Sequence, residues 1–197
     1  MKKLTLNQIK DNPKILTFEI PWTNEVLLLR PLEPKDNELL ASFLEGLSST
    51  TRKNYTLDDF GPTTAAEFCN AIARYDKLRF LLLLDETVIG LFEFSMDIPD
   101  TDKDRLLKYK LDYSEDEVCR FGPCLADAYQ NKGLAKLIFP YIKGIAKKTG
   151  NNSILLWGGV LKDNIKAIRF YKKVGFKELG EFINKDYNDC IDMILHL

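Results

Sequence analysis

The feature that most constrains this chain is an apolar segment that leads into a polar turn and then into an amphipathic helix. Residues 118–126 are mostly apolar, and the turn Gln130-Asn131-Lys132-Gly133 follows them. Beyond the turn, apolar residues recur at the spacing of one helical face. They are Leu134, Leu137, Ile138, Tyr141, Ile142 and Ile145, and Gly150 ends the pattern. The sequence therefore predicts a strand, a tight turn and a helix in succession.

The turn has the properties of an anion site. Backbone N–H groups in the first turn of a helix have no partner inside the helix, and the helix dipole places partial positive charge there. Gly133 lets a ligand approach the backbone, and Lys132 and Lys136 add charge. A plain strand-to-helix turn, with Gly133 for tightness, explains the same residues. The phosphate signatures G-x-x-x-x-G-K-[ST] and G-x-G-x-x-G are absent.

Two motifs resemble those of the GNAT superfamily of acyl-CoA N-acyltransferases. The turn is similar to the family's pyrophosphate loop, [Arg/Gln]-x-x-Gly-x-[Gly/Ala], with Ala135 at the last position. Residues 164–176 resemble its second signature, Asn-x-x-Ala-x-x-x-Tyr-x-x-x-Gly-Phe, and the matching residues are Asn164, Ala167, Tyr171, Gly175 and Phe176. One predicted strand separates the motifs, as in the family. The resemblance covers roughly residues 25–197.

The resemblance implies a mixed α/β fold. A central, strongly twisted and mainly antiparallel sheet would be flanked by helices, and two parallel strands would splay where acetyl-CoA enters. The implied activity is transfer of the acetyl group of acetyl-CoA to a primary amine by direct attack. No metal or redox cofactor is implied. The acceptor would be a small molecule, a peptide or a protein.

The resemblance also assigns roles to residues. The backbone of Cys124 and Leu125 would pair with the pantetheine arm like an added strand. Asn164 would hydrogen-bond or position the pantetheine, and Tyr171 would lie near the thioester sulfur. Gln130 opens the pyrophosphate loop, and the backbone amides that would hold the pyrophosphate are those of Asn131, Lys132, Gly133, Leu134, Ala135 and Lys136.

The reaction needs an acid, an oxyanion donor and a base. Tyr171 can donate a proton because its unperturbed pKa of about 10 exceeds the pKa of a thiol, about 8.5. The Leu125 amide can polarise the thioester carbonyl. Alternatively, Tyr171 is an aromatic residue packed in the core. Base candidates are Glu93, Glu117 and Asp127; each is also explained as a structural or solvated residue, and a water chain could replace them.

Two other functions stay open. A catalytically silent domain of this family would bind acyl-CoA as a sensor or scaffold, and the lack of an obvious base favours it. A generic α/β nucleotide-binding module would bind ATP or NAD instead of CoA. Affinity for these ligands distinguishes the two.

Composition limits the class of protein. The chain has 197 residues and a net charge of −1, which suits one globular domain and gives no reason to expect a nucleic-acid or membrane partner. No apolar run is long enough to span a membrane, and the N-terminus lacks the apolar core of a secretion signal. We therefore expect a cytoplasmic protein, and its oligomeric state, monomer or homodimer, stays open.

The four cysteines form no C-x-x-C pair, so a zinc or thioredoxin-like site is not indicated. They are Cys69, Cys119, Cys124 and Cys190, and we expect buried free thiols. Cys124 lies near the proposed site, but we expect it on a strand and not as a nucleophile.

The remaining elements follow from periodicity and turn residues. Residues 1–24 form an extension in which a strand at 14–20 could pair with a strand at 25–30. Further strands are expected at 79–84, 87–96, 118–126, 153–160, 176–182 and 189–197, and helices from 34 to 47, 64 to 76 and 165 to 174. Thr64 and Glu67 form a capping-box pattern.

The loops 48–62 and 97–117 are expected to decide the acceptor. In the family the first of them borders the acceptor, so Arg52, Tyr55 and Asp58 are candidate contacts, although solvated loop residues are the simpler interpretation. Residues 97–117 contain eight acidic and four basic residues. This excess could attract a cationic amine, but a solvated loop or a short helix is favoured.

Overall fold

The computed structural model describes residues 3–55, 57, 59–72, 76–111 and 117–197. The chain divides into two compact units. Unit 2 holds Leu4–Phe94 and Pro123–Leu134, and unit 1 holds Ser95–Gly122 and Ala135–Leu197 with the start of the chain.

Unit 2 is built on an antiparallel set of strands. The order is β1 (Phe18–Trp22), β2 (Glu25–Pro31), β3 (Lys77–Leu84) and β4 (Thr87–Ser95). β1 and β2 form a hairpin in which Trp22 is opposite Glu25, so the turn is Thr23-Asn24, and Thr23 has a φ of 55°. The predicted hairpin at the N-terminus is therefore confirmed.

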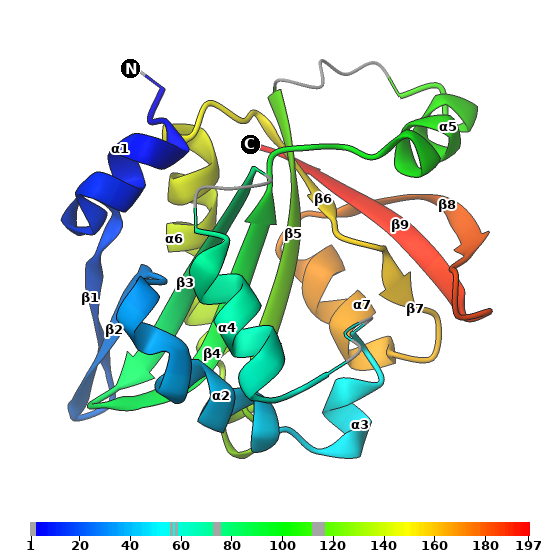
Figure 1. Cartoon of the computed structure of the whole chain (residues 1–197). Helices are drawn as coiled ribbons and strands as arrows, with labels where there is room; N and C mark the ends of the chain where they lie inside the picture. Colours follow the sequence, from blue (N-terminus) through cyan, green and yellow to red (C-terminus); the bar gives the residue numbers. More distant parts are fainter. Residues whose placement is uncertain (1–2, 56, 58, 73–75, 112–116) are drawn as a thin grey trace. The chain divides into compact units, whose positions relative to one another are not determined.

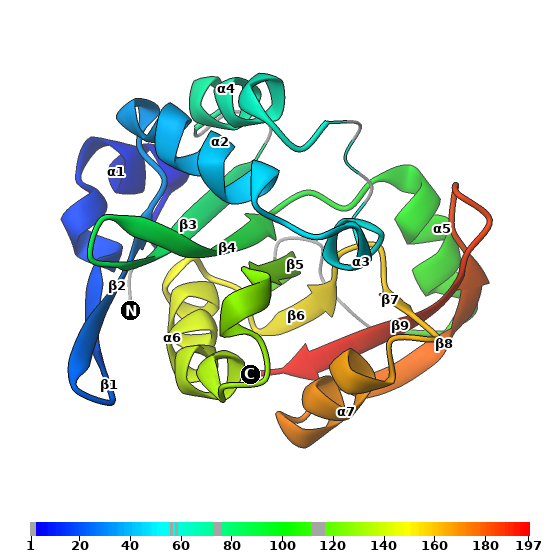
Figure 2. The same cartoon turned by 90° about the horizontal axis from the view of Figure 1, so that it is seen from below.

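Helices cover one face of these strands. α2 (Asn37–Glu45) and α4 (Pro62–Asn70) contact each other over β3 and β4 (Figures 1 and 2). Their buried side chains join a cluster that includes Leu40, Leu44, Phe68 and Leu81. The other helical turns of unit 2 are α1 (Leu6–Asp11), η1 (Pro13–Leu16), η2 (Pro34–Asp36), α3 (Ser49–Arg52) and η4 (Asp127–Tyr129).

Unit 1 contains a parallel pair of strands. The strand order is β5 (Val118–Leu125), β6 (Ser153–Leu156), β9 (Asp189–His196) and β7 (Val160–Leu161), and β8 (Lys177–Ile183) pairs with β9. β5 and β6 run parallel, whereas β6, β7 and β8 are antiparallel to β9.

Alternation along the strands of unit 1 separates two apolar layers. Leu155 and Ile194 pack with Leu106 of α5 (Asp100–Lys108). On the opposite face, Leu195 lies against Gly175, just after α7 (Ile165–Lys173). Figure 2 shows α5 and α7 on opposite sides of β9. The long helix α6 (Leu134–Lys148) contains Pro140 and buries its predicted stripe at Leu134, Ile138, Ile142 and Ile145.

The fold class is confirmed, because the structure is a mixed α/β arrangement with a mostly antiparallel sheet, one parallel pair and flanking helices. One expected strand was wrong: residues 153–160 are not continuous but break into β6 and β7. Gly158 and Gly159 both adopt positive φ between them, which a strand cannot accommodate.

Three local expectations were also wrong. The first strand begins at Phe18 because Pro13–Leu16 form a 3-10 turn. Thr64 is not a helix cap: Pro62 occupies the first turn of α4, where its missing N–H costs nothing, and the Thr64 hydroxyl donates to the carbonyl of Asp59 (2.8 Å). Residues Ser49–Arg52 are helical, where a loop was expected.

Candidate active site

The parallel ladder of β5 and β6 is short. Its last pair is Phe121 with Leu156, the Trp157 N–H then donates to the Phe121 carbonyl (2.9 Å), and β5 continues to Leu125. The strand β5 therefore continues past the last pair of its register with β6.

Alternation along β5 decides which backbone groups face β4. The Ala126 N–H donates to the Ile89 carbonyl of β4 (2.9 Å), and the Cys124 carbonyl lies beside Gly90, where a Cβ atom would come within 3.2 Å of it. Successive backbone groups of a strand point to opposite sides, so those of Leu125 and Pro123 point away from β4. Of the two amides assigned to the pantetheine arm, this favours Leu125 over Cys124.

The edge formed by Pro123 and Leu125 offers few donors. Proline has no N–H, so at these two positions only Leu125 has an amide proton to offer. The carbonyl of Pro123 accepts the Tyr55 hydroxyl (2.6 Å), and the carbonyl of Leu125 accepts Nε2 of Gln130 (3.0 Å). An oxyanion donor on this edge is therefore restricted to the Leu125 N–H.

The turn before α6 has the geometry of an anion site. Asn131 and Gly133 have φ values of 60° and 81°. A Cβ atom on Gly133 would meet nothing within 4 Å, so the backbone is open to an approaching group. Among the residues that the structure describes, the backbone N–H groups of Asn131, Lys132 and Gly133 have no acceptor. α6 begins directly after them, at Leu134.

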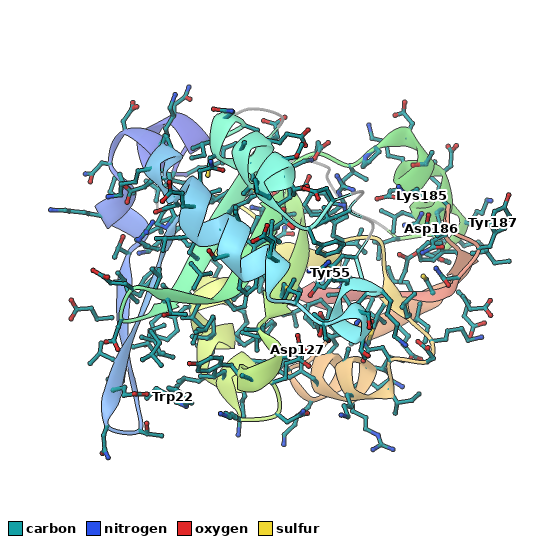
Figure 3. All side chains as sticks on the ribbon, turned by 60° about the horizontal axis from the view of Figure 1, so that its bottom comes forward. Trp22, Tyr55, Asp127, Lys185, Asp186 and Tyr187 are labelled. Atoms are coloured by element: carbon teal, nitrogen blue, oxygen red, sulfur yellow. The ribbon has the colours of Figure 1, made fainter. Side chains whose placement is uncertain are left out.

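Aromatic side chains support this turn from within unit 2. The ring of Tyr129 lies 6.2 Å from the ring of Trp22 at the end of β1, and the Lys132 ammonium lies 5.3 Å from the Tyr129 centroid. Figure 3 labels Trp22, which lies next to the β1–β2 turn. The N-terminal extension thus contacts the segment that leads into α6.

Tyr171 lies in an aromatic cluster of unit 1. Its ring centroid is 5.2 Å from Phe176 and 5.4 Å from Phe170, and Phe139 of α6 packs against both of these rings. Burial raises the pKa of Tyr171 above its usual value. Its hydroxyl has no hydrogen-bond partner among the described residues. The residue is therefore both a core aromatic and a phenol that stays protonated.

Asn164 caps α7. Its Oδ1 accepts the N–H of Ala167 (3.1 Å), as the sequence predicts for the first position of this helix. The structure thus explains Asn164 by helix capping; a contact with pantetheine stays a prediction.

The three candidate bases already have partners. Glu93 accepts Nε of Arg79 (2.6 Å), with both side chains largely buried, and Glu117 accepts Nδ2 of Asn152 (2.6 Å). Asp127 accepts hydrogen bonds from the Ser48 hydroxyl, the Ser48 N–H and the Thr51 hydroxyl, and the Ser48 contacts hold its pKa below the usual range. A carboxylate with a lowered pKa is a weaker base.

All four cysteines are free and buried, as expected. Burial raises the pKa of the Cys124 thiol to about 12, so at neutral pH it is a thiol and not a thiolate nucleophile. Within the described residues, no group of three or more potential ligand side chains is placed to hold a metal ion.

The acceptor-loop candidates have structural contacts. Arg52 donates to the carbonyls of Leu47 (2.8 Å) and Glu45 (2.7 Å) at the end of α2, so it secures that helix. The Tyr55 hydroxyl binds Pro123, and Asp58 lies outside the described residues.

The acidic segment 97–117 is less available to a cation than its composition indicates. Asp97 and Asp102 bind the buried Arg120, Asp102 also binds Arg105, and residues 112–116 lie outside the described residues. Sequence reasoning missed this network because its centre, Arg120, lies 18 residues or more from Asp97 and Asp102.

These features define the class of protein. A family model described as the acetyltransferase (GNAT) family matches residues 44–176 of the 197-residue chain. The chain therefore belongs to the GNAT acetyltransferase family, as the two motifs predicted. No curated protein sequence matches it.

Solved structures share this fold at low sequence identity. The GNAT domain of S. lividans PAT has a TM-score of 0.71 at 16% identity, covering 94% of this chain and 99% of that domain. The ribosomal-protein-S5-alanine acetyltransferase from Vibrio fischeri has a TM-score of 0.70 at 13% identity, covering 91% and 96%. The aminoglycoside acetyltransferase AAC(6')-Ib with coenzyme A has a TM-score of 0.66 at 19% identity, covering 86% and 94%.

Proposed function

We propose that this chain transfers the acetyl group of acetyl-CoA to a primary amine by direct attack of the amine on the thioester. The observation that carries the proposal is the turn before α6, where open backbone amides and Gly133 precede a long helix. Such a turn binds phosphates through oriented N–H groups and the helix dipole. Membership of an acetyltransferase family makes the pyrophosphate of CoA the expected ligand.

Each residue then has a defined task. The amides from Asn131 to Lys136 hold the pyrophosphate, and the Leu125 N–H hydrogen-bonds the pantetheine or polarises the thioester carbonyl. The protonated Tyr171 hydroxyl donates a hydrogen bond to the leaving sulfur. Its raised pKa makes complete proton transfer to a thiolate unfavourable, so stabilisation by the hydrogen bond is its main contribution.

The amine acceptor is not specified by this geometry. The structural neighbours named above include a ribosomal-protein-S5-alanine acetyltransferase and an aminoglycoside acetyltransferase, and the second of these has also been solved with coenzyme A and kanamycin. Both classes present primary amines, so small amines and protein amines are the acceptors to test first.

The proposed phosphate site is tested by a matched pair of glycine variants. Gly133→Glu places a carboxylate at the turn and should weaken CoA binding by about 100-fold or more, because like charges brought together cost several kcal/mol. Gly144→Glu is the control, since Gly144 also has open space around its Cβ position but lies further along α6, away from the turn. Isothermal titration with CoA is the measurement; equal affinities of the two variants would show that the pyrophosphate lies elsewhere.

The activity is tested with a pooled acceptor assay. The protein is incubated with acetyl-CoA and a mixture of polyamines, aminoglycosides, amino acids and peptides, and acetylated products are identified by mass spectrometry. A product above the no-enzyme control establishes the transfer and the acceptor class together. Binding of acetyl-CoA without any product across these classes would contradict the proposed transfer.

A non-catalytic acyl-CoA sensor or scaffold is the second candidate. The specific observation in its favour is that Glu93, Glu117 and Asp127 all have partners, while Pro123 removes a backbone donor. The Tyr171 hydroxyl has no hydrogen-bond partner in the part of the chain that the structure describes, and this favours the enzymatic function. The pooled assay separates the two candidates.

A further inference from the structure

Asp127 joins two segments that are far apart in the sequence. Its Oδ1 accepts the hydroxyls of Ser48 (2.6 Å) and Thr51 (2.7 Å), and its Oδ2 accepts the Ser48 N–H (2.9 Å). Figure 3 labels Asp127 after β5 and Tyr55 just beyond α3. Three hydrogen bonds to the carboxylate thus hold the start of α3.

Gln130 extends this connection to the turn before α6. Its Nε2 donates to the Thr51 hydroxyl oxygen (3.0 Å) and to the Leu125 carbonyl (3.0 Å). The buried Thr51 hydroxyl therefore accepts from Gln130 while it donates to Asp127. Hydrogen bonds in such a chain polarise and strengthen one another.

The segment 48–55 depends on these contacts. α3 spans only Ser49–Arg52, and a helix of one turn is not stable by itself. Beyond α3, the Tyr55 hydroxyl binds the Pro123 carbonyl. The contacts that order 48–55 therefore include several with the end of β5 and the turn that follows it.

We propose that the hydrogen-bonded cluster of Ser48, Thr51, Asp127 and Gln130 couples the cofactor turn to segment 48–55. A ligand held by the amides that follow Gln130 fixes the backbone of this residue, and thereby its side-chain bonds to Thr51. Binding of CoA then further stabilises the ordered form of 48–55, and this form in turn strengthens CoA binding, because such coupling is reciprocal. Asp127 acts as a positioning residue and not as the base.

The inference rests on the proposed function only because it takes the pyrophosphate of CoA as the ligand of the turn. The cluster itself exists in the ligand-free structure, so it can be tested with and without CoA. Hydrogen–deuterium exchange with mass spectrometry follows peptides that cover 47–55 and 130–136 separately.

The ligand-free experiment tests the cluster. Asp127→Asn keeps the size of the side chain but replaces an acceptor oxygen with a donor group, so exchange in 47–55 should accelerate. Asp186→Asn is the matched control, because Asp186 is exposed in the turn between β8 and β9 (Figure 3) and should leave 47–55 unchanged. Equal exchange of 47–55 in wild type and Asp127→Asn would overturn the inference.

The experiment with CoA tests the coupling. In the wild type, CoA should slow exchange in both peptides. In Asp127→Asn, CoA should protect 130–136 with little effect on 47–55. The affinity of this variant for CoA should be roughly fivefold or more below that of the wild type. Thr51→Val should behave like Asp127→Asn, whereas Thr51→Ser, which keeps the hydroxyl, should restore the wild-type response.

The outcomes separate the two proposals. Protection of 130–136 alone in the wild type would overturn the coupling and leave the cofactor site intact. Failure of CoA to bind the wild type would overturn the proposed function, and the coupling to CoA with it, even if Asp127→Asn still accelerated exchange in 47–55.

Discussion

The proposed chemistry depends on a small number of hydrogen-bond donors. Pro123 has no N–H, and the Leu125 amide is thus the donor at the end of β5 that points away from β4. Tyr171 adds one buried phenol in another part of the chain. In the reaction proposed above, stabilisation of the thioester would therefore rest on one backbone and one side-chain group, together with alignment of the reactants.

Replacement of Tyr171 by Phe should lower kcat about 10- to 100-fold, the range expected for loss of one hydrogen bond to a developing charge. Acetyl-CoA affinity should change little, because the ring keeps its packing with Phe170 and Phe176. Steady-state kinetics with the acceptor found in the pooled assay, combined with CoA titration, measure both values. Unchanged kcat would mean that Tyr171 is only a core aromatic residue.

At the scale of elements, an ion pair holds α5 on β9 in addition to apolar contacts. Arg105 binds the fully buried Asp192, its guanidinium lies 3.9 Å from the Phe182 centroid, and the Tyr109 hydroxyl donates to Asp192 (3.0 Å). Gly180 of β8 makes room for the Tyr109 ring. The acidic segment therefore contains a short helix with a defined position on unit 1.

Arg105→Met should lower the free energy of unfolding by about 3 kcal/mol, because it leaves Asp192 buried without its cation. Lys108→Met, an exposed residue on the same helix, is the control and should change stability by less than about 0.5 kcal/mol. Urea denaturation followed by circular dichroism gives both values. A loss of similar size in the two variants would show that the pair with Asp192 does not secure α5.

For the whole molecule, the buried thiols couple stability to alkaline pH. Burial raises the pKa values of Cys119 and Cys124 to about 12 each, whereas thiols in an unfolded chain ionise near about pH 8.5 to 9. The native state therefore keeps protons that the unfolded state releases, and stability must fall as pH rises through this range.

Between pH 9 and pH 10, these two thiols together should lower the free energy of unfolding by about 2 kcal/mol. Urea titrations at a series of pH values, with a reducing agent present, measure the slope. Cys124→Ala should reduce their joint contribution to the slope by about half, even though the substitution also destabilises the core. A pH dependence identical to that of the wild type would show that this thiol ionises normally in the fold.

Much of the architecture was predictable because its causes are local. The stripe of α6 and the cap of α7 follow from residues within a few positions of each other. The wrongly predicted element boundaries also have local causes. Pro13 begins a 3-10 turn that delays the first strand, and Pro62 moves the start of α4 ahead of Thr64. The paired glycines after Trp157 separate β6 from β7. Among the described residues, no helix is long and apolar enough to cross a membrane.

The sequence by itself determined the family, the turn before α6 and the order of the motifs, since periodicity and spacing are written in consecutive residues. Tertiary structure decided the state of each side chain at the candidate site. Asp127 became a partner of Ser48, 79 residues away, and Glu93 a partner of Arg79. Asp192, which no motif singled out, became the buried anchor of α5. Such pairings depend on contacts between distant segments, and the pKa and role of a carboxylate depend on those contacts.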